Sequence, residues 1–152
     1  MTKSILLFIT LSFLFISSSV AQDKPEQLMA HKWKIVKVEP YGDSLKNIFA
    51  AMPEEIQKQI EKSFAKMTQG SYVDLHSDKT FEILMLTPDP QDPEGANEDL
   101  STGEWKFDLI DGDKKLITIE EGGRESKLFI LELDNKKMTI SDKKQVIMYL
   151  EH

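Results

Sequence analysis

Hydrophobic and polar residues alternate along most of the chain beyond residue 70. A period of two is typical of strands that bury one face. It predicts strands at residues 71–75, 80–86, 104–109, 116–119, 127–133, 138–141 and 146–150. A further β-rich segment, WKIVKV at 33–38, precedes them and is closed by Pro40. The chain is therefore expected to form eight strands.

The connections between these strands are mostly short, and one carries the tight-turn signal Asp111-Gly112-Asp113. Short connections make neighbouring strands antiparallel. Eight consecutive antiparallel strands would leave two open edges, and closing the sheet removes both. We therefore expect a mainly β fold, an eight-stranded up-and-down antiparallel barrel. A two-sheet sandwich is the alternative, because several strands have only four or five residues.

The apolar period becomes that of a helix between Asp43 and Gln69. Pro53 suits a first helical position, and the two acids after it suit the positive end of the helix dipole. One apolar stripe of this helix consists of Ile56, Ile60, Phe64 and Met67. A shorter helical turn before it carries Leu45, Ile48 and Phe49 on one face. We expect one amphipathic helix between strands 1 and 2, packed against its own domain; a membrane-surface or partner helix would show a similar pattern.

The first 21 residues resemble a cleavable signal peptide. Lys3 precedes an apolar run at 5–16, and Ser19-Val20-Ala21 fits a cleavage site. The run is too short for a spanning helix, which needs roughly 20 apolar residues. The alternative is an uncleaved N-terminal anchor. We expect a signal peptide at 1–21, a polar lead-in at 22–30 and a barrel domain at 31–152, with no transmembrane span after cleavage.

Composition narrows the compartment and the function classes. The chain has 152 residues, a net charge of −7 and no cysteine. Its length fits a single domain. The negative charge makes nonspecific nucleic-acid binding unlikely. The lack of cysteine excludes disulfides, thiolate catalysis, cysteine-ligated metals and a lipid anchor on cysteine. The expected location is therefore secreted or periplasmic.

Residues 87–101 (TPDPQDPEGANEDLS) carry three prolines and five acids. This composition predicts a solvated, mobile loop. A calcium site and a lid over the barrel mouth are the functional alternatives. The spacing of Asp89 and Asp92 does not match a calcium-binding loop, and Pro93 stands where another ligand would be needed. An inert solvated loop is the favoured interpretation.

No catalytic or metal-binding motif is evident. His31, His76 and His152 are scattered, and none forms a metal-ligand spacing with another histidine or a carboxylate. The sequence contains no nucleophile elbow, phosphate-binding loop or dinucleotide fingerprint. We therefore expect a protein that is not an enzyme and that uses no cofactor.

Strand alternation selects the side chains expected inside the barrel. Trp105 and Phe107 share one face of their strand, opposite two charged residues, and Phe129, Leu131 and Leu133 share a face of theirs. Trp33 is expected near a closed end, in a structural role. If the barrel is hollow, the expected ligand-lining residues are Trp105, Phe107, Phe129, Met148, Phe81, Ile83 and Met85.

Several short motifs resemble the small exported lipocalin-like domains of bacteria. They are Trp33 on the first strand, the inserted helix, the hairpin from Leu75 to Phe81, and Gly103-Glu-Trp105-Lys-Phe107. His31 stands where such proteins commonly have the glycine of G-x-W. The resemblance implies a calyx that binds a small hydrophobic molecule without catalysis. The alternative is a protein-interaction or inhibitor module with a solid barrel, whose partner the sequence does not identify.

Overall fold

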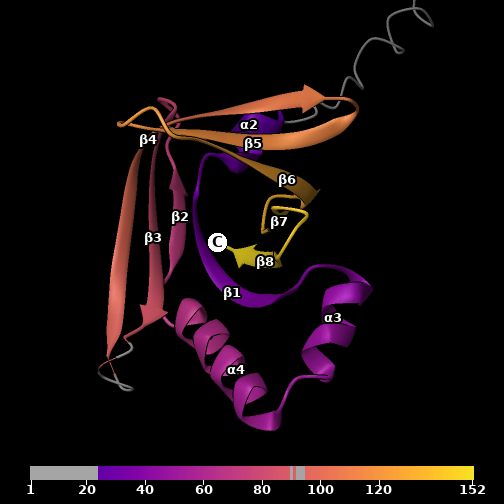
Figure 1. The fold of residues 1–152 in the computed structure, drawn as a ribbon. Coiled ribbons are helices and arrows are strands. Elements are labelled where there is room, and N and C mark those ends of the chain that lie inside the picture. The colour runs from indigo at the N-terminus through magenta and orange to yellow at the C-terminus, as the bar shows by residue number, and fades with distance from the viewer. Residues whose placement is uncertain (1–23, 90, 92–94) are drawn as a thin grey trace, which may run out of the picture.

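The computed structural model describes residues 24–89, 91 and 95–152. They form a closed antiparallel barrel in which eight strands follow one another in sequence order, as expected (Figure 1). The signal peptide expected at 1–21 lies outside the described residues. The strands are β1 (Lys32–Pro40), β2 (Tyr72–Leu75), β3 (Thr80–Pro88), β4 (Ala96–Ile110), β5 (Asp113–Glu120), β6 (Glu125–Leu133), β7 (Lys137–Ser141) and β8 (Val146–Glu151).

The described residues also form helices α2 (Pro25–Met29), α3 (Gly42–Ala50) and α4 (Glu54–Thr68). The amphipathic helix expected between strands 1 and 2 is α4, and the shorter helical turn expected before it is a separate helix, α3. Pro53 separates them because its ring removes a backbone N–H and restricts the residue before it. Helix α2 lies in the segment expected to be a loose lead-in. None of the described helices is long and apolar enough to cross a membrane.

Strand β4 is the longest strand, and it turns a corner of the barrel (Figure 1). Its first part pairs with β3 from Ala96 to Glu104, and its second part pairs with β5 from Gly103 to Ile110. The loop expected at 87–101 is therefore too long, because Ala96–Ser101 belongs to this strand. The prolines and acids of 87–101 predict a loop, although the residues from 96 to 100 are exposed on both faces of a strand. A strand that is solvated on both faces needs no apolar alternation.

Helix α4 fills a gap in the barrel wall. Strand β2 has four residues, so β1 and β3 separate where it begins (Figure 1). Helix α4 packs between them and contacts both strands. Phe64 and Met67, from the apolar stripe identified in the sequence, pack against the core. The helix thus packs against its own domain, as expected.

One end of the barrel is closed by helix α2 and the two histidines flanking the barrel domain. Trp33 is fully buried there, and its Nε1–H donates to the Met29 carbonyl at 2.8 Å. The ring of His31 stacks on that of His152 with centroids 4.2 Å apart, and both rings meet Trp33 edge-on. Trp33 therefore has the structural role expected at a closed end.

The prediction that Phe129 and Leu131 face the interior of the barrel from β6 is wrong. Leu128 and Ile130 belong to the core, so Phe129 between them points outward. A bulge lies between Ile130 and Glu132, and it leaves Leu131 47% exposed. Leu133 returns to the core beyond the bulge. The uninterrupted apolar run from 128 to 131 gave the sequence pattern no way to identify the inward residues.

Candidate functional site

Burial of the interior side chains is uneven, and it distinguishes two regions of the barrel. Trp33, Ile35 and Leu75 are at most 1% exposed. By contrast, a second set of core-facing apolar residues is only partly buried, so water reaches part of their surface. This set includes Ile83, Met85, Phe107, Leu128 and Met148, together with Phe64 and Met67 from α4.

An apolar groove of about 390 Å³ lies between α3, α4 and the adjoining ends of β1 and β8. Neither helix contains a buried residue. Ile48 on α3 is 54% exposed although it lines this groove. The lining consists of Pro40, Leu45, Ile48, Phe49, Met52, Ile60, Phe64, Gln145 and Val146. Because Phe64 lines the groove and also packs against the core, the groove adjoins the core.

Backbone and side-chain hydrogen bonds hold both ends of α3. Before the helix, the backbone N–H of Tyr41 donates to the Gln145 carbonyl at 2.9 Å. After it, the side-chain amide of Gln57 on α4 donates to the Met52 carbonyl at 2.7 Å. These bonds anchor the chain on either side of α3, to the β7–β8 turn and to α4.

Asp142 shapes the turn that carries Gln145 and Val146. Its carboxylate accepts backbone N–H bonds from Lys144 at 2.9 Å, Gln145 at 2.8 Å and Val146 at 3.3 Å. Burial would raise the pKa of Asp142, but these three donors outweigh burial and hold the pKa below its usual value. The carboxylate therefore stays charged near neutral pH and fixes this side of the groove.

A charged cluster lies at the end of β1, before α3. Glu39 accepts hydrogen bonds from the ammonium of Lys37 at 2.7 Å and from the hydroxyl of Tyr149 at 2.7 Å. Both bonds lower the pKa of Glu39, the one from Lys37 most. Lys46 on α3 approaches the same carboxylate at 3.8 Å. This cluster therefore links α3 to the outer wall formed by β1 and β8.

The sequence-predicted ligand residues occupy different places. Phe81, Ile83, Met85, Trp105, Phe107 and Met148 belong to the core or pack against it. Trp105 is 2% exposed, and its Nε1–H donates to the His76 carbonyl at 2.9 Å. This burial and hydrogen bond indicate a structural role for Trp105. Phe129 lies on the outer wall, with the ammonium groups of Lys115 and Lys143 4.9 and 3.9 Å from its ring centroid.

Sequence reasoning missed the groove. None of the seven predicted residues lines it. The available signal was the apolar face of the shorter helical turn, because Leu45, Ile48 and Phe49 all prove to be lining residues. The pattern identified this face but not what lies opposite it. The opposite wall includes Gln145 and Val146 beside the β7–β8 turn, which is distant in sequence from α3.

A second hollow, of about 260 Å³, lies on the outer wall over β6, β7, β8 and β1. Its lining mixes charged and apolar groups: Val36, Glu132, Lys137, Thr139, Tyr149, Leu150 and Glu151. Glu151 faces Lys137 with an N–O distance of 3.8 Å. This lining lacks the apolar character of the groove beneath α3 and α4.

The described residues contain no group of three or more histidine and acidic side chains able to hold a metal ion. In the β2–β3 turn, Nε2 of His76 lies 3.4 Å from a carboxylate oxygen of Asp74, and Nδ1 lies 2.9 Å from the hydroxyl oxygen of Thr80. Of the two acids considered as calcium ligands, Asp89 and Asp92, the second lies outside the described residues. Comparisons with family models, curated proteins and solved structures found no match.

Proposed function

We propose that this protein binds a small hydrophobic molecule without catalysis, in the groove between α3, α4 and the barrel and in the interior that adjoins it. The observation that carries the proposal is the apolar lining of this groove, in which Gln145 supplies the one polar side chain among the described lining residues. Its volume of about 390 Å³ falls within the usual range for small-molecule sites, roughly 300–1,000 Å³.

The partly buried interior residues support the same function. Met85 and Met148 are flexible, polarisable side chains that adapt to apolar ligands of different shape. Each methylene that a ligand buries contributes about 0.8 kcal/mol. A chain of about fifteen methylenes would contribute roughly 12 kcal/mol, which leaves about 8 kcal/mol, a micromolar affinity, after an association cost of about 4 kcal/mol. Protein-binding sites also expose apolar surface, so the ligand titration below is what separates a carrier from a protein-interaction or inhibitor module.

We further propose that the protein is an exported, lipocalin-like carrier, on the basis of the sequence features at 1–21 and around Trp33. Export predicts that the mature chain begins at Gln22. N-terminal sequencing of the extracytoplasmic protein would test this directly. Recovery of intact Met1 in a membrane fraction would contradict cleavage after Ala21, favour the uncleaved N-terminal anchor and leave the binding site unaffected.

The binding test uses long-chain fatty acids and fatty alcohols of increasing length, titrated by calorimetry into the purified protein. Ile48→Glu places a charge at the exposed side of the groove without disturbing a buried residue. We expect it to weaken binding at least roughly tenfold, because an apolar ligand would then have to approach a carboxylate. Mass spectrometry of the native protein from its own host would identify a co-purifying molecule.

Ile56→Glu is the matched control, since Ile56 is 41% exposed on α4 but does not line the groove. It should leave binding nearly unchanged. Equal weakening by the two substitutions would indicate nonspecific adsorption to the helices and contradict the groove. Absence of saturable binding by every ligand in the series would overturn the proposed function.

A further inference from the structure

The first part of β4 has an open edge. Strand β3 pairs with β4 from Ala96 onward, but the pairing with β5 begins only at Gly103. Among the described residues, no strand lies on the other side of Ala96–Ser101. Figure 1 shows this segment as the outermost ribbon on the left, beyond β3. The barrel is therefore closed by the second part of β4, while the first part leaves a row of unpaired backbone groups.

The hydrogen bonds around this segment show which backbone groups point outward. The N–H of Trp105 donates to the Lys79 carbonyl, toward β3, while the carbonyl of Thr102 accepts from Glu121, away from β3. Backbone groups alternate along a strand. Those of Leu100 and Glu98 therefore point away from β3, like those of Thr102. The N–H and C=O of both residues have no partner in the part of the chain that the structure describes.

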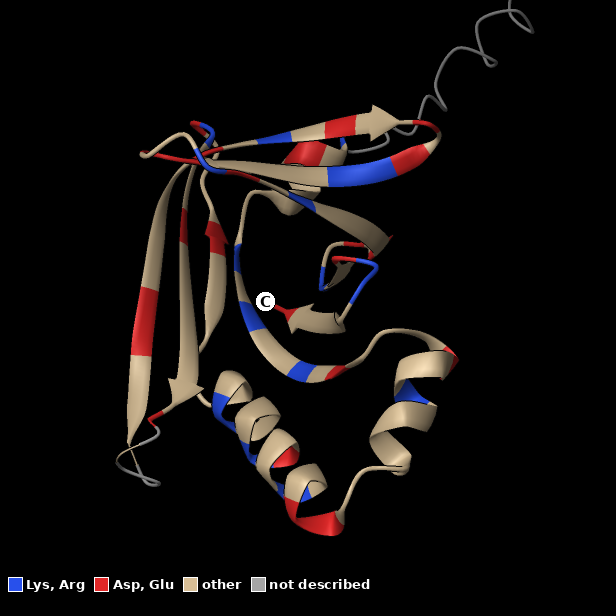
Figure 2. Cartoon of the chain, in the orientation of Figure 1, with Lys and Arg blue, Asp and Glu red and all other residues tan. Residues whose placement is uncertain are grey.

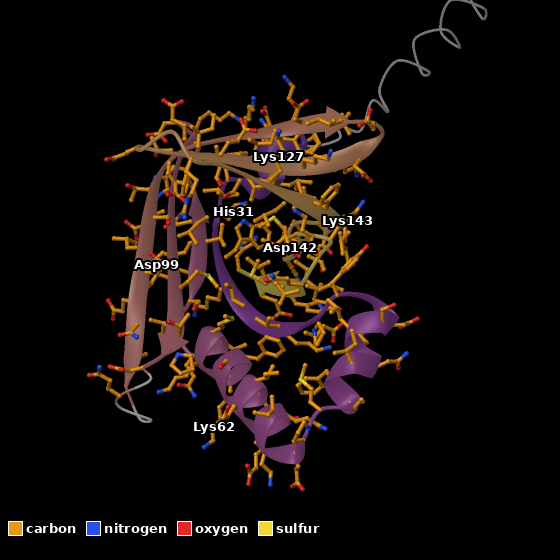
Figure 3. All side chains as sticks on the ribbon, in the orientation of Figure 1. His31, Lys62, Asp99, Lys127, Asp142 and Lys143 are labelled. Atoms are coloured by element: carbon orange, nitrogen blue, oxygen red, sulfur yellow. The ribbon has the colours of Figure 1, made fainter. Side chains whose placement is uncertain are left out.

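The side chains beside this edge combine an apolar row with two acids. Leu100 is 57% exposed and lies opposite Leu84, which lies opposite Tyr72, so the row ends at the open edge. Glu98 lies on the same face as Leu100, and Asp99 on the other face. Neither acid forms a direct ion pair with another described residue; Asp99 helps to raise the pKa of Arg124, whose guanidinium pairs with Glu120. Figure 2 shows the acidic patch on this strand, and Figure 3 labels Asp99.

We propose that the open edge of β4 binds an extended, positively charged peptide segment, which adds to the sheet as a further antiparallel strand. The geometry specifies the order apolar, basic, basic along that segment. Its apolar side chain would extend the row that ends at Leu100, and its two basic side chains would face Asp99 and Glu98. The backbone groups of Leu100 and Glu98 would supply up to four hydrogen bonds.

Charge argues against a second copy of this chain as the occupant. Antiparallel pairing of two β4 edges would bring Glu98 and Asp99 of each copy together, and like charges on adjacent strands repel. Charged residues on an edge commonly prevent self-association. The same acids attract a cationic strand, and the net charge of −7 favours such a partner at longer range. This site is separate from the groove and does not depend on the proposed function.

The test measures binding of a fluorescent peptide, acetyl-Ser-Thr-Leu-Lys-Lys-Thr-Lys-Gly-amide, to the full chain by anisotropy at low salt. N-methylation of its leucine and second lysine blocks the backbone groups that face Leu100 and Glu98, and should weaken binding at least roughly tenfold. N-methylation of the first lysine, whose N–H points away from β4, should be tolerated. Equal effects of the two modifications would overturn strand addition.

Variants of the protein test the same site with the peptide unchanged. Leu100→Pro removes an edge N–H but no hydrogen bond to β3, and Leu100→Ala removes only the side chain. We expect the proline variant to bind the peptide several-fold more weakly than the alanine variant. The double variant Glu98→Gln, Asp99→Asn should reduce both affinity and its salt dependence, whereas Glu55→Gln, Glu61→Gln makes the same charge change on α4 and should do neither.

Three results would contradict the proposal. Identical affinity of the proline and alanine variants would show that the backbone edge is not used. Identical effects of the two charge-matched double variants would reduce the interaction to general attraction. A dimer in solution that dissociates in Leu100→Pro would assign the edge to a second copy of the chain instead.

Discussion

A side chain on Gly103 would collide with the carbonyl oxygen of Ile119. The Cβ of a substituted residue would lie far inside van der Waals contact with this oxygen. The close approach occurs where β4 leaves β3 and begins to pair with β5. The corner of the barrel thus depends on the two strands meeting without a side chain between them.

Gly103→Ala should destabilise the protein by at least about 2 kcal/mol, because the clash is with backbone and only a shift of β4 or β5 relieves it. Gly122→Ala is the control. A Cβ there meets nothing within 4 Å, so the change should stay within roughly 0.5 kcal/mol. Urea unfolding of both variants measures the difference. Similar stabilities would show that the corner tolerates a side chain.

Phe64→Ala should cost about 3 kcal/mol, because the phenyl ring packs against the core from α4. Lys62→Ala, on the exposed face of the same helix, should change stability by no more than roughly 0.5 kcal/mol. Figure 3 shows Lys62 directed away from the barrel. Thermal and chemical unfolding compare the two variants. Small and equal losses would mean that α4 contributes little to the barrel wall.

The Glu39 and Tyr149 pair should make stability pH-dependent on the acid side. The hydrogen bonds from Lys37 and Tyr149 lower the pKa of Glu39 in the folded state, so their stabilisation is complete above its usual value of 4.5. It is lost as the pH falls through the lowered pKa. Tyr149→Phe should therefore cost about 1 kcal/mol at pH 7 and progressively less toward pH 3.

The same pair has the opposite dependence at high pH. The hydrogen bond to Glu39 raises the pKa of Tyr149 above its usual value of 10, so this contribution is present below pH 10 and is lost as the pH rises through the raised pKa. Unfolding free energies measured from pH 3 to 11 test both limbs. A difference between wild type and Tyr149→Phe that stays constant throughout would contradict the coupling.

Phe129→Ala and Met148→Ala should show whether an apolar ligand binds on the outer wall or in the interior of the barrel. Phe129 faces outward beneath two lysines, so its removal should leave the affinity for an apolar ligand unchanged. Met148 packs against the core and is partly accessible, so its removal should weaken binding about threefold to thirtyfold. Calorimetric titration of the two variants provides the comparison. Weaker binding by Phe129→Ala alone would place the ligand on the outer wall.

Strand order was predictable because turn chemistry and alternation agree through most of the barrel. The turn at Asp111 and Gly112 illustrates this, since both residues adopt the positive φ angles that their residue types favour. The face of Phe129 was not predictable, because a bulge lies within an unbroken apolar run. The groove was not predictable either. Its wall at Gln145 and Val146 meets α3 through contacts that no local pattern encodes.

Helix α4 packs between β1 and β3 beyond the four residues of β2, so side-chain packing holds this part of the barrel wall. Displacing the helix would separate side chains such as Phe64 and Met67 from the core while leaving every strand pairing intact. Access to the interior there is set by side-chain packing, which local fluctuations loosen at a lower free energy than global unfolding. The molecule thus combines a sheet held by hydrogen bonds with a section of wall that depends on the packing of one helix.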